Sequence, residues 1–199
     1  MSSLRHIGRP EATARDLYLD AARACILDVG WRRTTLTEVA RRAGVSRMTI
    51  YRSWSDMPQL LGDLMTREWG GVVAVAASGP EESGTVGRIV GTATRAITAL
   101  RENELFVRIV ELDPQLLLPY LLSRRGRSQQ AILDLVADQL RSGQATGEVR
   151  ETDPYVLARA LLLATHGFVL SAHTMVDDDV TDDELDAELT RALTRSLAP

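Results

Sequence analysis

The 199-residue sequence predicts an all-α protein built in two parts. Apolar residues recur at helical intervals along most of the chain, and no strand-like alternation persists. Gly79 and Pro80 follow Ser78 and form the clearest break. We therefore expect an N-terminal three-helix domain over 9–70 and a C-terminal domain of about six helices over 80–199.

The first helix is expected from Glu11 to Val29, where Gly30 ends it. Its apolar residues follow the spacing of a single buried face, formed by Tyr18, Ala21, Ala22, Cys25 and Val29. Cys25 is the only cysteine, so an internal disulfide is excluded and a buried packing role is expected.

Residues 35–54 have the pattern of two short helices joined by a tight turn. Thr35 and Glu38 have the spacing of a capping box that opens the first of them. The small side chain of Ala40 lets the two helices cross closely, and Gly44 can adopt the positive φ that the turn needs. The pattern predicts a helix-turn-helix.

The second helix of this motif begins after Ser46, which is expected to cap it, and runs over 47–54. Ile50 and Trp54 lie four residues apart and share its inner face. Its other faces are polar and basic, which favours DNA contact over an ordinary solvated hairpin. We expect Arg47, Met48 and Thr49 to reach base edges, and Thr35, Ser46, Tyr51 and Arg52 to hold phosphates.

The charge distribution supports this interpretation, although the whole chain has a net charge of −4. Residues 1–54 hold ten arginines against five acidic residues, a net of +5. The remainder holds thirteen arginines against 22 acidic residues, a net of −9. Only the N-terminal segment therefore has the positive charge that DNA phosphates attract.

The N-terminal segment resembles the TetR-type transcriptional regulators over about residues 9–70. The matching residues are Ala21, Ala22, Cys25, Ile26, Gly30, Trp31, Thr34, Thr35, Leu36, Val39, Ala40, Ala43, Gly44, Val45, Ser46, Ile50, Tyr51, Trp54 and Leu60. The resemblance implies an all-α homodimer in which a DNA-binding domain precedes a helical domain that binds a small molecule.

The chain departs from the family pattern at three places. Trp54 stands where the family usually has Phe, which we interpret as a mild change on a buried face. Ser53 stands where a His is common. Met57 and Pro58 replace a usual Lys-Glu pair, so a common phosphate-contacting lysine is missing, and Arg52 or the arm residues Arg5 and Arg9 are expected to replace it.

Beyond the break, helices are expected at 84–101, 103–112, 114–123, 127–142, 154–175 and 182–197, after a fourth helix at 56–77. The last two helices are apolar on more than one face, which favours a dimer interface but also fits the core of a monomer. The expected interface residues are Ala160, Leu163, Gly167, Leu170, Leu185, Leu189 and Leu193.

Thr165 and His166 are polar residues within an otherwise apolar helix, so they need partners if buried. They are candidates for the orienting groups of an apolar ligand pocket. The other candidate pocket residues are Trp69, Phe106, Arg108 and Tyr120. For each of these residues taken alone, a plain core or surface position is favoured over a role in a pocket.

No catalytic motif, phosphate-binding glycine loop or cofactor motif is present in the sequence. His166 and His173 are seven residues apart, which is not a usual zinc spacing, so no metal is expected. No signal-like segment and no uninterrupted apolar run of about 18 residues occurs, so we expect a cytoplasmic protein without a membrane partner.

These observations favour a homodimeric transcriptional regulator that is not an enzyme, and by analogy with the family a repressor. Its partners would be a double-stranded DNA operator, an unknown small-molecule effector and a second copy of itself. Two alternatives stay open: a helical small-molecule-binding protein or enzyme with a vestigial helix-turn-helix, and an adaptor that binds other proteins.

Overall fold

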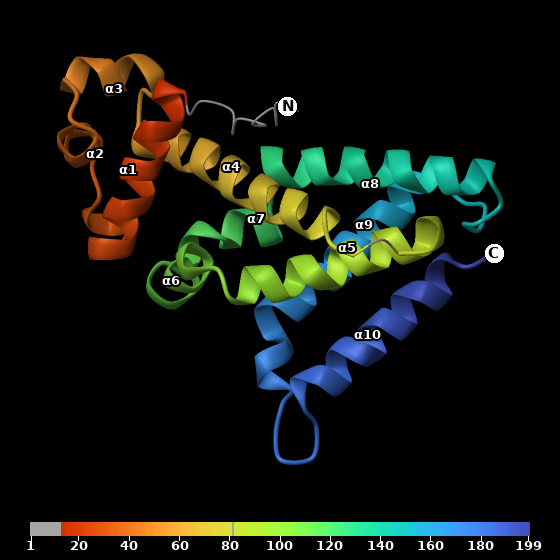
Figure 1. Cartoon of the computed structure of the whole chain (residues 1–199). Helices are drawn as coiled ribbons and strands as arrows, with labels where there is room; N and C mark the ends of the chain where they lie inside the picture. The colour runs from red at the N-terminus through yellow and green to blue at the C-terminus, as the bar shows by residue number, and fades with distance from the viewer. Residues whose placement is uncertain (1–12, 81) are drawn as a thin grey trace, which may run out of the picture.

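The computed structural model describes residues 13–80 and 82–199, and within these ranges every regular element is helical. The N-terminal head contains α1 (Ala14–Val29), α2 (Leu36–Arg42) and α3 (Arg47–Ser53), and the long α4 (Met57–Ala77) leads away from it (Figure 1). The body comprises α5 (Gly84–Arg101), α6 (Glu104–Leu112), α7 (Leu118–Leu122), α8 (Arg127–Ala145), α9 (Pro154–Ser171) and α10 (Asp182–Leu197). The all-α prediction is confirmed.

The helices expected at 84–101 and 182–197 are confirmed without change, and most others differ by a few residues at one end. The exception is 114–123, which divides into a 3-10 turn, Pro114–Leu116, and the short α7. Pro119 explains the division, because proline interrupts a helix interior but fits the first turn of a new helix. The expected helix 154–175 ends at Ser171 and continues as the 3-10 turn Ala172–Thr174.

The first core lies inside the head and joins it to α6. Its buried members are Leu19, Ala21, Ala22, Cys25, Ile26, Leu36, Val39, Ala40, Ile50, Trp54, Leu60, Leu61, Leu64, Leu105 and Ile109. The predicted buried face of α1 is wrong at Val29, which is exposed because it lies in the last turn of the helix. Leu19 and Ile26, which were not predicted, are buried on this face. Because Leu105 and Ile109 belong to α6, the head is packed onto the body.

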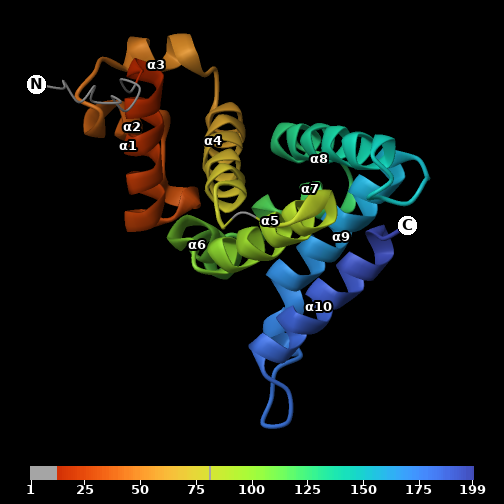
Figure 2. The same cartoon turned by 45° about the vertical axis from the view of Figure 1, so that its right-hand side comes forward.

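The second core joins α5, α8, α9 and α10 (Figure 2). Its buried members are Ile89, Val90, Ile97, Leu133, Ala137, Leu140, Val149, Leu157, Ala158, Leu161, Leu189, Leu193 and Leu197. Segment 154–174, which includes α9, is long and apolar enough to cross a membrane by length and composition, with a mean hydropathy of 1.5. Here one of its faces packs against α5 and α8, and 28% of the apolar window is buried.

Candidate DNA-binding surface and ligand cavity

The turn of the helix-turn-helix is built from local backbone contacts. The Thr35 hydroxyl accepts the Glu38 amide at 3.2 Å, and the Ser46 hydroxyl accepts the Thr49 amide at 3.2 Å, so both helices are capped. The predicted capping box is only half formed, because the Glu38 carboxylate accepts from Arg41 at 2.9 Å instead of returning to Thr35. Gly44 has a φ of 68°, the left-handed conformation that glycine tolerates best.

The outer face of α3 presents the side chains that were expected to contact DNA. Ile50 and Trp54 are fully buried, whereas Met48 is 63% exposed and Arg47, Tyr51 and Arg52 are exposed. Thr35 and Ser46 are also exposed. Thr49 is half-buried, and its hydroxyl lies 2.9 Å from that of Ser46.

The arginines of the two motif helices differ in their partners. On α2, Arg41 pairs with Glu38 and Arg42 pairs with Asp28. On α3, neither Arg47 nor Arg52 makes an ion pair with any residue that the structure describes. The positive charge of α3 is therefore available to an external anion, which is what a recognition helix requires.

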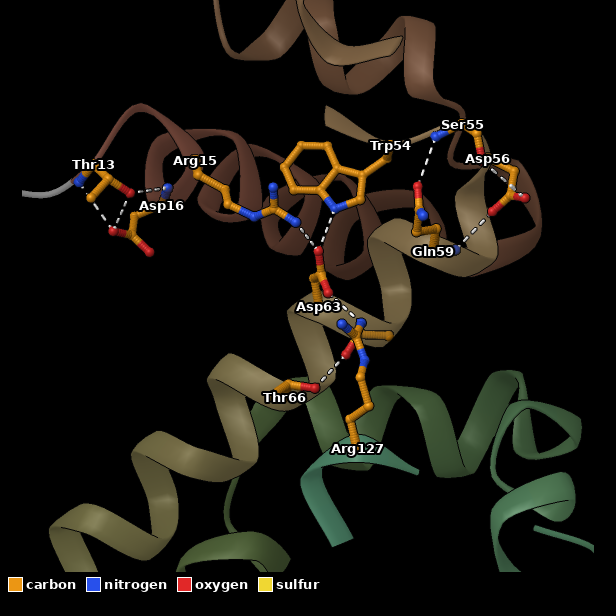
Figure 3. Close-up of polar contacts among 11 residues, drawn as sticks. Thr13, Arg15, Asp16, Trp54, Ser55, Asp56, Gln59, Asp63, Thr66 and Arg127 are labelled. Carbon is orange, nitrogen blue, oxygen red and sulfur yellow. Dashed lines mark hydrogen bonds and ion pairs between the residues drawn. The ribbon is translucent and has the colours of Figure 1, made fainter. Parts of the chain in front are cut away.

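Trp54 is more than a mild change on a buried face. It follows α3 directly, and its indole N–H donates to the Asp63 carboxylate on α4 at 2.7 Å (Figure 3). A phenylalanine has no such donor. The ring packs edge-on against Tyr18, with centroids 6.4 Å apart, and the Arg15 guanidinium lies 4.7 Å from its centroid. This tryptophan thus links the end of α3 to α4.

Asp63 was not identified from the sequence, yet four elements of the fold meet at its carboxylate. It accepts hydrogen bonds from Trp54, from Arg15 on α1 and from Arg127 at the start of α8 (Figure 3). Burial alone would raise the pKa of Asp63, but these three donors outweigh burial and leave its pKa lowered. The signal in the sequence was Trp54 itself, because a buried indole N–H needs a hydrogen-bond acceptor.

The body contains a cavity of about 510 Å³ between α4 and α5–α9. Five of the six predicted pocket residues line it: Trp69, Phe106, Tyr120, Thr165 and His166. Trp69 and Phe106 meet edge to face, with centroids 5.6 Å apart. Arg108 does not line the cavity, because it is two residues from Phe106 and so lies on a different face of α6.

Two polar side chains of α9 face this cavity, but they differ in availability. The Thr165 hydroxyl already donates to the Leu161 carbonyl at 2.9 Å. The imidazole of His166 forms no hydrogen bond with the described residues, and burial lowers its pKa. A neutral His166 ring is therefore the polar group that α9 offers to a ligand.

The residues predicted for the dimer interface fall into three groups. Ala160, Leu163 and Gly167 form an exposed strip on α9, with Leu163 70% exposed. Leu189 and Leu193 are not on that surface, because they are buried in the second core of the same chain. Leu170 and Leu185 are half-buried, the first lining the large cavity and the second a smaller hollow beside α9.

Comparisons with known proteins agree with this architecture. Residues 19–64 match the family described as bacterial regulatory proteins, tetR family. An HTH-type transcriptional regulator of Mycobacterium tuberculosis is 36% identical over 155 residues, 77% of this chain and 79% of that protein. The solved repressor QsdR of R. erythropolis has a TM-score of 0.66 at 19% identity, covering 96% of this chain and 98% of its own. SmeT, solved in complex with triclosan, has a TM-score of 0.57 at 25% identity over 90% of each chain.

The fold and the exposed α3 define a helix-turn-helix transcriptional regulator with a second helical domain. The chain belongs to the tetR family of bacterial regulatory proteins.

Proposed function

We propose that the protein is a homodimeric repressor that a small molecule releases from its DNA operator. The observation that carries the DNA-binding half is the outer face of α3, where Arg47 and Arg52 are exposed without an ion pair in the described part of the chain. Arg47, Met48 and Thr49 would contact base edges, and Thr35, Ser46, Tyr51 and Arg52 would contact phosphates.

The dimer half rests on the exposed strip Ala160, Leu163 and Gly167 of α9. Small residues in such a strip permit close approach of a second copy related by a twofold axis. Two copies of α3 would then enter successive major grooves, about 34–36 Å apart, on a near-palindromic site. A domain division at 9–70 and 80–199 would separate DNA binding from ligand binding and dimerisation.

The ligand half rests on the cavity, whose volume lies within the range of small-molecule sites. The triclosan complex of SmeT shows that a relative of this fold binds a small molecule. Release requires that the ligand bind the DNA-incompetent arrangement more tightly. In this proposal the protein acts in the cytoplasm and has no catalytic role.

Protection mapping on the DNA that flanks the gene tests the DNA half, with Arg47→Ala and Arg52→Ala as probes. Arg47→Ala should lose about 1–3 kcal/mol of discrimination between operator and random DNA, because a base contact is removed. Arg52→Ala should weaken binding to operator and random DNA alike. It should also reduce, by about one, the slope of the logarithm of the binding constant against the logarithm of the salt concentration. Arg195→Ala, an exposed arginine on α10, is the matched control and should change neither. Equal losses on both duplexes for Arg47→Ala would contradict its base-reading role.

Molecular mass in solution tests the dimer half. The wild type should run at twice the chain mass of 21.9 kDa. Leu163→Glu should give a single chain, because a carboxylate would be buried in the interface without a partner. Leu122→Glu changes an exposed leucine away from the strip and should remain a dimer. A single-chain wild type at DNA-binding concentrations would contradict the proposal.

A further inference from the structure

The charged residues that line the cavity are all positive. They are Arg124, Arg125 and Arg127, at the junction between α7 and α8, and no aspartate or glutamate is among the lining residues that the structure describes. The chain as a whole has more acidic than basic residues, 27 against 23. All three arginines are exposed, so this positive charge lies where the cavity meets solvent, and it is a local feature rather than a reflection of composition.

The rest of the lining is mainly apolar and aromatic, with Trp69 and Phe106 packed together on one side. Arg124 and Arg125 make no ion pair with the described residues, and Arg124 lies over the ring of Tyr120, 5.2 Å from its centroid. A ligand that combined an apolar body with one negative group would satisfy both parts of this lining. A cationic ligand would find no counter-charge.

Arg127 belongs both to the cavity and to the contacts that hold the head. Its guanidinium pairs with Asp63 Oδ1, while Asp63 Oδ2 accepts from Arg15 and Trp54 (Figure 3). The Asp63 side chain is only 13% exposed, so few water molecules can replace a lost donor. A negative ligand group near Arg127 would compete with Asp63 for the same guanidinium.

We propose that the effector is an amphipathic anion whose negative group binds Arg124, Arg125 and Arg127 and draws Arg127 away from Asp63. This inference rests on the proposed ligand-released function and adds the chemical class of the ligand and its route to the head. Once Arg127 leaves, the contact between α8 and α4 at Asp63 is lost, and the Asp63 carboxylate, which keeps Trp54 and Arg15 as donors, is free to shift together with the indole at the end of α3. The competition is a differential contact of the kind that a population shift requires.

Calorimetry with two amphipathic probes, each built on one alkyl chain, tests the chemical class of the ligand. Dodecanoate and dodecanol share an apolar chain and differ in charge. Dodecanoate should bind at least about tenfold more tightly, because charge-assisted hydrogen bonds are worth more than neutral ones. Arg124→Gln with Arg125→Gln should remove this preference and leave dodecanol binding unchanged. Arg195→Gln is the control and should keep the preference. Equal affinity for both probes, or binding of neither, overturns the inference.

The indole N–H resonances of the three tryptophans test the route to the head. Trp69 lines the cavity, so its resonance should move with either probe. Trp54 does not line the cavity but donates to Asp63, so its resonance should move with dodecanoate and stay in place with dodecanol. Trp54→Phe identifies its signal. Arg127→Gln should abolish the Trp54 response while Trp69 still responds. A Trp54 signal that stays in place with dodecanoate bound overturns the competition.

Both measurements are made on the full chain without DNA. If no operator were protected, the proposed function would be contradicted, but the ligand-binding results would remain valid. If the cavity bound dodecanol as tightly as dodecanoate or more tightly, this inference would be contradicted, but DNA binding would not be affected.

Discussion

The head and the body differ in how completely they are packed. In the head, Ile50, Trp54 and Leu60 are fully buried in one continuous core. In the body, the second core borders a cavity of about 510 Å³, and Leu133 and Ala158 belong to both. A close-packed head keeps α3 in one shape, as DNA reading requires, whereas an open body can change its packing around a ligand at low cost.

The largest expected effect comes from the same substitution made in each region. Ile50→Ala should lower the free energy of unfolding by about 2–5 kcal/mol, because it creates a cavity in a closed core. Ile132→Ala removes the same atoms from a side chain that already faces the cavity, and should cost well under half as much. Urea unfolding of both variants measures the difference, and equal costs would contradict the contrast in packing.

A second pair separates the two regions by their tryptophans. Trp54→Phe removes a donor from the buried Asp63 carboxylate, so a loss of about 1.5–3 kcal/mol is expected. Trp69→Phe keeps an aromatic ring against Phe106, and the Trp69 indole donates no hydrogen bond to a described residue. Its loss should be under about 1 kcal/mol in the same urea titration. A larger loss for Trp69→Phe would reverse the assignment of the two rings.

The head could be predicted from the sequence because its determinants act over a few residues. Thr35 and Ser46 each cap the helix that follows by accepting the backbone amide three residues ahead, and Gly44 permits its turn by its own backbone conformation. These relations hold in any tertiary context, so the pattern in 35–54 was sufficient. The Glu38 carboxylate does not accept the Thr35 amide as predicted, because the charged guanidinium of Arg41, one turn further on, is a stronger donor.

The body could be predicted only in part. Its helices follow from apolar spacing, but the spacing does not say which apolar face meets which. Leu189 and Leu193 therefore looked suitable for a partner subunit and are buried against their own chain. The contact between Asp63 and Arg127 joins residues 64 positions apart, a distance at which no local pattern operates. The arginine run 124–127 was visible in the sequence, but its cavity was not.

Two glycines provide a smaller contrast between the turn of the head and the helix that leaves it. Gly44 has a φ of 68° with no atom within 4 Å of an added Cβ, so Gly44→Ala should cost about 1–2 kcal/mol from backbone strain alone. Gly70 lies in α4 with the same open space, and Gly70→Ala should stabilise by about 0.5–1 kcal/mol. Thermal unfolding of both variants should give shifts of opposite sign, and a destabilised Gly70→Ala would indicate a hidden contact on α4.

The smallest expected effect is a pH dependence that belongs to the body alone. Burial lowers the pKa of His166 from its ordinary value of 6.5, so the unfolded chain binds this proton more tightly than the folded one. Stability should therefore be unaffected above pH 6.5 and fall as the pH drops through that value toward the lower folded pKa. His166→Gln should flatten this part of the profile, while His173→Gln, at an exposed position, should keep it. Because His166 lines the cavity, a bound ligand that covers the ring should steepen the loss, and a profile unchanged by His166→Gln would place the titrating group elsewhere.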